Sequence, residues 1–170
     1  MSVLFIAALI MIVLIAGVDQ LIKIQILENF ELYQEKPFLK IGDLDIMHLK
    51  YIENDGSAFS SFSGQTVFLL IVSVIGILIC SYVLIRHGRK NRLLYTSLVM
   101  VLGGAVGNMI DRIFRDGYVI DYLDLQLFDF AVFNFADCFV TVGTVLLLIY
   151  ILFFMDSSEK QETRGNQYGE

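Results

Sequence analysis

The chain has 170 residues, 56% of which are hydrophobic, and its mean hydropathy of +0.70 is far too high for a soluble domain of this length, so the composition predicts a membrane protein. A formal net charge of -6 argues against a nucleic-acid-binding protein, because a phosphate-binding surface needs clustered Lys and Arg. Two cysteines are too few for a disulfide framework or a thiolate metal site.

The first apolar run covers residues 3–18 and extends through Leu21 and Ile22 past a single charge, Asp19. A helix needs about 20 apolar residues to cross the hydrocarbon of a bilayer, so this run predicts a retained transmembrane helix. A cleaved signal peptide is the alternative. It is disfavoured because no Lys or Arg precedes the apolar core.

Three more apolar runs, near residues 66–85, 93–110 and 139–155, are each long enough to cross a bilayer with a modest tilt. Basic residues crowd the short turn between the second and third runs: Arg86, Arg89, Lys90 and Arg92. Because short cytoplasmic loops carry an excess of Lys and Arg, we expect this turn and both termini in the cytoplasm. The polar loops at 19–65 and 111–138 are then expected at the outer face.

The first outer loop contains two patterns. Residues 20–35 have helix-like spacing of apolar side chains and could extend the first helix along the membrane surface. After Pro37, apolar and polar residues alternate, with turn signals at Gly42-Asp43 and Asp55-Gly56. This second pattern predicts a small antiparallel sheet on the outer surface.

The expected fold is therefore a mainly α membrane protein with four transmembrane helices and a small extracytoplasmic β-sheet. Residues 1–155 are expected to form a single four-span membrane domain, which includes the outer-face region at about 19–65. Residues 156–170 have no apolar pattern and are predicted to be a disordered cytoplasmic tail. In the third run, Gly103 and Gly107 are four residues apart, which allows two helix backbones to approach closely.

The catalytic classes open to this chain are few. His48 and His87 are the only histidines, and the expected topology places them on opposite sides of the membrane. That placement excludes an HExxH metalloprotease and leaves no Ser-His or Cys-His pair at a shared site. Carboxylates remain as the candidate catalytic groups.

Asp121 and Asp137 are both expected at the outer face, where a hairpin between them could bring their side chains together. Two carboxylates that lie close together cannot both ionise cheaply, so such a pair shares one proton. One carboxylate then acts as a base on water while the other donates to the scissile carbonyl, as in aspartic proteases. A pair of this kind predicts optimal activity at mildly acidic to neutral pH.

Polar neighbours strengthen this hypothesis. Asn108, Asp111 and Arg112 share one face of the third helix if that helix continues, and Asn134 lies three residues before Asp137. Asn side chains can donate to a substrate backbone, and Arg112 can pair with a carboxylate or a lipid phosphate. The alternative for Asp111 and Arg112 is a structural role, in an ion pair that holds the loop and joins them either to each other or to a residue across the loop.

Two other functions remain open from the residues alone. A small ion-coupled transporter or channel subunit would use the acidic residues as an ion path, but it needs carboxylates near the bilayer midplane, whereas these are expected at its edge. A non-enzymatic scaffold would bind lipids or helices through the outer sheet. It would tolerate conservative changes at Asp121 and Asp137.

Five blocks of sequence carry a resemblance to a known family: DQLIK at 19–23, NDGSAFSSF at 54–62, GNMIDR at 107–112, VIDYLD at 119–124 and FNFADC at 133–138. In this order and with four spans, they resemble lipoprotein signal peptidase (signal peptidase II), a family of bacterial membrane aspartyl proteases. The resemblance covers nearly the whole chain. The chain departs from the family pattern at Ile22, Ser57, Tyr122 and Cys138.

The resemblance implies that Asp121 and Asp137 are a catalytic dyad. It also implies that six polar residues bind substrate or support the site: Asn54, Asn108, Arg112, Asn134, Asp19 and Asp111. The implied substrate is a prolipoprotein whose lipobox Cys already carries diacylglycerol, cut just before that Cys at the outer face of the bacterial cytoplasmic membrane. The implied partners are this substrate and membrane lipids, with no metal or organic cofactor.

Overall fold

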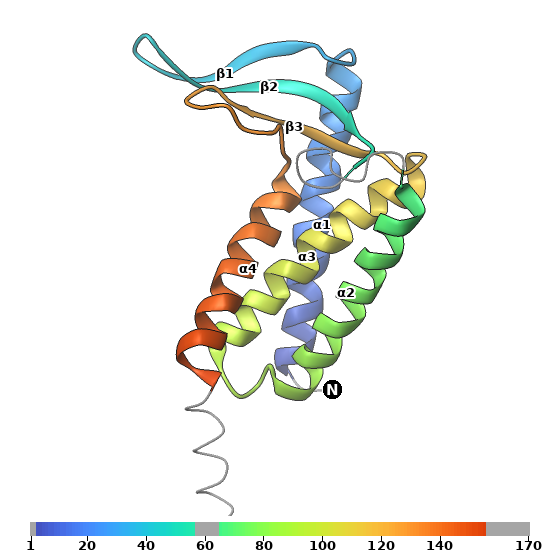
Figure 1. Cartoon of the computed structure of the whole chain (residues 1–170), viewed down its shortest axis with the longest axis vertical. Coiled ribbons are helices and arrows are strands. Elements are labelled where there is room, and N and C mark those ends of the chain that lie inside the picture. Colours follow the sequence, from blue (N-terminus) through green and yellow to red (C-terminus); the bar gives the residue numbers. More distant parts are fainter. Residues whose placement is uncertain (1–2, 57–64, 156–170) are drawn as a thin grey trace, which may run out of the picture.

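A computed structural model describes residues 3–56 and 65–155 of the chain. Its helices and strands are α1 (Val3–Asn29), β1 (Glu35–Ile41), β2 (Leu44–Asn54), α2 (Thr66–His87), α3 (Arg92–Phe114), β3 (Val119–Leu125) and α4 (Phe135–Phe153). The helices lie side by side as a bundle, and the strands form a sheet at one end of it (Figure 1). The expected tail at 156–170 and the departure at Ser57 lie outside the described residues.

Within the described part of the chain, four helices are long and apolar enough to cross a membrane, which confirms the predicted fold class. Large apolar side chains point away from the bundle on three of these helices: Val13 of α1 is 67% exposed, Val67 of α2 is 71% exposed and Leu152 of α4 is 72% exposed. In water such a surface would cause aggregation. In a bilayer it faces lipid tails, which are equally apolar.

Helix α3 is the centre of the bundle, because it packs against each of the other three helices. Small residues allow the close approach. A Cβ added to Gly104 would lie 2.3 Å from the backbone oxygen of Ala136 in α4, and one added to Gly107 would lie 2.8 Å from Oδ2 of Asp19 in α1. The close helix packing predicted from the glycines of this run is therefore confirmed.

The helical extension predicted for residues 20–35 is only partly present, since α1 continues without a break to Asn29 but Glu35 already begins β1. Its last turns are held by the sheet, where buried Ile26 packs with Tyr51 of β2 and Ile120 of β3. The polar end of α1 is thus stabilised by tertiary packing rather than by its own apolar pattern.

The sheet is antiparallel with strand order β1-β2-β3. Its first hairpin turns at Gly42, whose φ of 61° suits glycine, as the turn signal predicted.

Two features of the sheet differ from the prediction. Strand β1 begins before Pro37, which is tolerated because β1 is an edge strand. Strand β3 was not predicted, because its two aspartates disfavour a strand and only burial under neighbouring elements stabilises it.

The start of α1 and the turn between α2 and α3 lie at the end of the bundle opposite the sheet (Figure 1). His48 is on β2 and His87 ends α2, so the two histidines lie at opposite ends of the molecule, as expected. The described residues of the motifs proposed to carry chemistry therefore gather near the sheet, and the basic turn lies far from them.

Candidate active site

Strand pairing brings Asn54 to Asp121. Ile52 of β2 lies opposite Asp121 of β3, and Asn54, two residues further along, projects from the same face of the sheet as a diagonal neighbour. Its Nδ2 donates to Oδ2 of Asp121 over 2.8 Å. Asp121 is only 2% exposed, so this bond holds a carboxyl group that is almost completely removed from solvent.

The start of α4 fixes Asp137. Asn134 is the N-cap of this helix, and its Oδ1 accepts from the backbone N of Asp137 over 2.9 Å. In return, Oδ2 of Asp137 accepts from the backbone N of Asn134 over 3.1 Å, which completes a capping box. The other oxygen, Oδ1, accepts from Nδ2 of Asn108 in α3 over 2.7 Å.

The two carboxyl groups are joined through one amide. Nδ2 of Asn134 donates to Oδ1 of Asp121 over 2.6 Å and to Oδ1 of Asn108 over 3.1 Å. The side chain of Asn134 therefore contacts both Asp121 and the backbone of Asp137, and Asn108 contacts both Asn134 and Asp137. A strand, a helix end and a helix start thus meet at one small polar cluster.

Burial, and next the negative charge of Asp137, raise the pKa of Asp121 from 3.8 to about 7. The hydrogen bonds from Asn54 and Asn134 act in the opposite direction but are weaker. At neutral pH and below, Asp121 can therefore carry a proton, as one member of a proton-sharing pair must.

The pair faces a cavity of about 650 Å³. Its polar lining includes Asn54, Asn108, Arg112, Asp121 and Asp137. The remaining walls are mostly apolar and come from α2, α4 and the segment at 130–133, with Cys138 beside the pair. An apolar cavity with a few converging polar groups is the usual form of a site for a small or lipid-like ligand.

A buried lysine of α1 contacts the residues that support this polar cluster. Lys23 is fully buried, and its Nζ lies 2.8 Å from Oδ2 of Asp19, 2.6 Å from Oδ2 of Asp111 and 3.0 Å from Oδ1 of Asn108. An ammonium group has three N–H donors, so each of them has an acceptor. The lysine also fixes the amide of Asn108, whose other end donates to Asp137.

The two acidic partners of Lys23 hold the backbone next to each carboxyl group of the pair. Oδ2 of Asp111 accepts from the backbone N of Ile120, which precedes Asp121, over 3.1 Å. Oδ1 of Asp19 accepts from the backbone N of Ala136, which precedes Asp137, over 3.0 Å. The predicted supporting residues thus contact the chain one position before each candidate catalytic group.

Asp111 and Arg112 do not pair with each other. Asp111 forms its ion pairs with Lys23 and Arg115, and Arg115 also donates to Oε1 of Gln20 over 2.9 Å. Arg112 instead lines the cavity and donates to the backbone oxygen of Gly56 over 3.0 Å. The mutual ion pair considered for these neighbours is therefore wrong, whereas Asp111 does form structural ion pairs with Lys23 of α1 and with Arg115.

Sequence reasoning assigned no role to Lys23, Gln20 or Arg115. A signal for Lys23 was present, because it lies four residues after Asp19 on a helix and a charge beside an apolar run is costly unless paired. The contacts of Gln20 and Arg115 join α1 to the end of α3 and depend on tertiary structure alone.

Tyr122, one of the departures from the family pattern, forms a hydrogen bond with the start of α4. Its hydroxyl accepts from the backbone N of Phe135 over 3.1 Å and so satisfies one of the free N–H groups in the first turn of α4. Burial raises the pKa of this phenol, so the hydroxyl stays protonated at physiological pH.

The fold is shared with solved bacterial membrane enzymes. Two solved structures, each described as a bacterial membrane enzyme, are similar to this chain. One has a TM-score of 0.78 at 27% identity and covers 86% of this chain and 87% of its own. The other has a TM-score of 0.76 at 26% identity and covers 88% of this chain and 94% of its own.

The sequence comparisons name the family. A profile of the family described as Signal peptidase (SPase) II matches residues 10–153. The lipoprotein signal peptidase of Lactobacillus johnsonii is 38% identical over 148 residues, which are 87% of this chain and 93% of that protein. The lipoprotein signal peptidase of Streptococcus pyogenes serotype M1 is 37% identical over 154 residues, 91% of this chain and 93% of the relative. The chain belongs to the signal peptidase II family and is a membrane peptidase.

Proposed function

We propose that this peptidase is an aspartyl endopeptidase that removes the signal peptide from diacylglyceryl-modified prolipoproteins, cutting just before the lipidated Cys. The observation that carries the proposal is the link through Asn134, which holds Asp121 beside Asp137 at a cavity with apolar walls. Family membership supplies the peptidase class, and this geometry favours the aspartyl type.

In the proposed reaction, Asp121 carries the proton of the pair because its pKa is raised to about 7. The carboxylate of Asp137 takes a proton from water, and the water oxygen attacks the scissile carbonyl carbon while Asp121 protonates the carbonyl oxygen. The diol that forms then collapses. Asp137 returns its proton to the leaving nitrogen, the C–N bond breaks, and Asp121 recovers a proton from one diol hydroxyl.

Three polar residues at the cavity are proposed to position the peptide. Asn54 and Asn108 hold the two carboxyl groups and can also contact a backbone amide. Nε of Arg112 is buried and has no hydrogen-bond partner within residues 3–56 and 65–155, so we assign it to a substrate carbonyl. The apolar walls, which include Leu69 and Val140, would take the acyl chains of the substrate.

The proposed site lies at the outer face of the cytoplasmic membrane, with both termini in the cytoplasm. The distribution of charge supports this orientation, because the basic turn and the start of α1 are at the opposite end of the bundle from the sheet. A diacylglyceryl group anchors its Cys at the membrane surface, where the bond before it can reach a pair at the end of the helices.

Cleavage of two forms of one precursor tests the substrate class. The purified enzyme in detergent is given a diacylglyceryl-modified prolipoprotein and, separately, the same precursor without lipid, and the products are weighed by mass spectrometry. We expect cleavage of the lipidated form only, at the bond before the modified Cys. Equal cleavage of both forms, or cleavage at another bond, would overturn the proposed specificity.

A further inference from the structure

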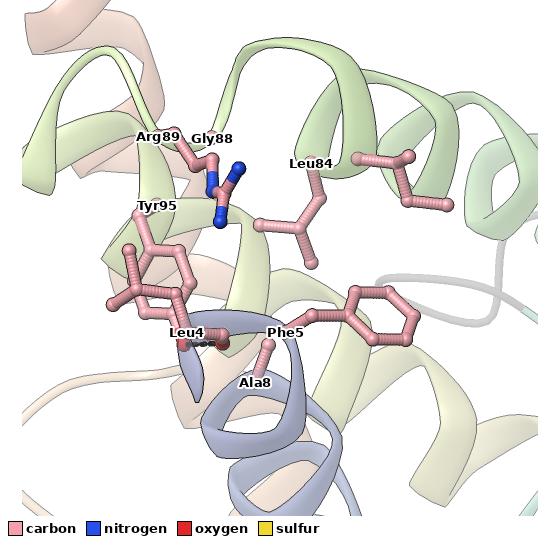
Figure 2. Close-up of a pocket in the computed structure, with 8 residues that line it drawn as sticks. Leu4, Phe5, Ala8, Leu84, Gly88, Arg89 and Tyr95 are labelled. Atoms are coloured by element: carbon pink, nitrogen blue, oxygen red, sulfur yellow. Dashed lines mark hydrogen bonds between the residues drawn. The ribbon is translucent and has the colours of Figure 1, made fainter. Parts of the chain in front are cut away.

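A second cavity lies at the opposite end of the bundle, between the start of α1 and the turn from α2 to α3 (Figure 2). Its volume is about 180 Å³, comparable with an engineered cavity of about 150 Å³ that holds benzene. Two of its lining residues, Arg89 and Tyr95, are polar, and the others are apolar or glycine: Leu4, Phe5, Ala8, Leu84, Ile85 and Gly88. It has room for a short apolar group beside a positive charge.

Arg89 lies at this cavity and has no counter-ion among the residues that the structure describes. Figure 2 shows its guanidinium group directed toward the cavity, between the side chains of Leu84 and Tyr95. No hydrogen bond or ion pair joins Arg89 to another residue of the described ranges. The sequence contains no Asp or Glu between Asp55 and Asp111, so the neighbouring segments of α2 and α3 offer no acidic partner.

The cavity walls are held by specific contacts. The hydroxyl of Tyr95 in α3 donates to the backbone oxygen of Leu4 over 2.8 Å, which ties the first turn of α1 to the wall. A Cβ added to Gly88 would lie 2.5 Å from the backbone oxygen of Leu84, so glycine allows the turn to close over the cavity. The N-terminal end of α1 adds a partial positive charge on the same side.

We propose that this cavity binds an anionic phospholipid. The phosphate would pair with Arg89, whose planar fork fits phosphate oxygens, and the adjoining part of the lipid would enter the cavity. The rest of the acyl chains would follow exposed apolar side chains such as Leu4 and Ile85, which are 48% and 60% exposed. A zwitterionic headgroup would bind less well, because its own cation meets the same basic turn.

Membrane topology alone accounts for a basic turn, but not for an apolar cavity under one of its arginines. The cavity is far from the candidate active site, at the other end of the helices, so this proposal does not depend on the proposed peptidase mechanism. Arg86 provides a matched comparison, since it is an exposed arginine in the last turn of α2 that does not line the cavity.

Tryptophan fluorescence tests the proposal, because the chain has no native Trp. A Phe5→Trp variant places one fluorophore in the cavity wall. The variant is reconstituted in phosphatidylcholine vesicles that contain a minor share of brominated phosphatidylglycerol or, in parallel, brominated phosphatidylcholine. We expect stronger quenching by the brominated phosphatidylglycerol.

In the Phe5→Trp background, Arg89→Gln should weaken the apparent affinity for phosphatidylglycerol about tenfold, because one charge-assisted contact is lost. In the same background, Arg86→Gln should leave this affinity nearly unchanged. Equal quenching by the two brominated lipids, or equal losses in Arg89→Gln and Arg86→Gln, would overturn the proposal. Relief of quenching by free glycerol phosphate would show that the site recognises phosphate rather than lipid, and would also overturn it.

Discussion

The protonation of Asp121 determines the expected pH dependence of activity. Burial and the charge of Asp137 raise the pKa of Asp121 to about 7, so its proton is lost as the pH rises through neutrality. The general acid then disappears, and we predict that kcat/KM falls on the alkaline side with a midpoint near pH 7. On the acid side, activity falls when both carboxyl groups are protonated and no base remains.

Initial cleavage rates of a lipidated precursor, measured from acid to alkaline pH in one detergent, check this profile. Protein that has been held at each extreme and returned to neutral pH serves as the control for irreversible unfolding. A rate that stays constant from neutral to strongly alkaline pH would contradict the assignment of Asp121 as the general acid.

Lys23 is predicted to stabilise the folded state strongly. It is fully buried between Asp19 and Asp111, and a Lys23→Met change would leave two buried carboxylates without their shared cation. We expect a loss of about 3 to 5 kcal/mol in the free energy of unfolding, as for other broken buried pairs. The cleavage rate should also fall, because Asn108 loses the contact that orients it toward Asp137.

Lys50→Met is the matched control, because Lys50 makes its ion pairs on the exposed sheet. Its effect on stability should stay below about 1 kcal/mol. Thermal or denaturant unfolding in detergent measures both variants. If Lys23→Met lowers the free energy of unfolding no more than Lys50→Met does, the buried lysine does not stabilise the folded state as proposed.

Residue roles could be predicted only in part from the sequence. The candidate site residues were recognisable because polar groups beside apolar runs are unusual, and the structure places Asn54, Asn108 and Asn134 against the two aspartates. The contacts themselves depend on strand register and helix contacts that link residues far apart in the chain. The sequence pattern therefore indicated the candidates but not which oxygen each amide contacts.

At the scale of elements, the contact between α3 and α4 positions half of the candidate dyad. A Cβ on Gly104 would overlap the backbone oxygen of Ala136, the residue before Asp137. We predict that Gly104→Ala pushes the start of α4 outward, costs about 1 to 3 kcal/mol of stability and lowers the cleavage rate. Unfolding curves and initial rates on the same preparation measure both effects.

Gly76→Ala is the control for this prediction. Gly76 lies within α2, and a Cβ there would meet nothing within 4 Å. Alanine is a better helix former than glycine, so this variant should be at least as stable as the wild type and fully active. If Gly104→Ala behaved in the same way, close packing at α3 and α4 would not be what positions Asp137.

The elements themselves were predictable to different degrees. The four transmembrane helices follow from hydropathy, which is a local property, and the structure confirms them. The start of α4 was placed too late, at residue 139, although Asn134 and Asp137 have the spacing of a capping box. Strand β3 could not be predicted, because its stability comes from β2 and from buried contacts with the end of α1.

At the scale of the whole molecule, the candidate active site and the basic turn lie at opposite ends. The candidate dyad, its buried supporting network and the sheet lie at one end of the bundle, and the basic turn with the second cavity lies at the other. Five segments of the chain supply the candidate active site: α1, the end of β2, the end of α3, β3 and the start of α4. Only the assembled membrane fold brings them together.

The most direct test of this account is the cleavage rate of Asp121→Asn and Asp137→Asn on a lipidated precursor, with Asp124→Asn as the control. Asp124 lies on the same strand as Asp121 but pairs with Lys50 on the sheet. We predict that each dyad variant loses at least about a hundredfold in rate, because a catalytic acid or base is removed, while Asp124→Asn stays near wild type. A folded Asp121→Asn or Asp137→Asn protein that cuts the precursor at close to the wild-type rate would contradict the aspartyl mechanism.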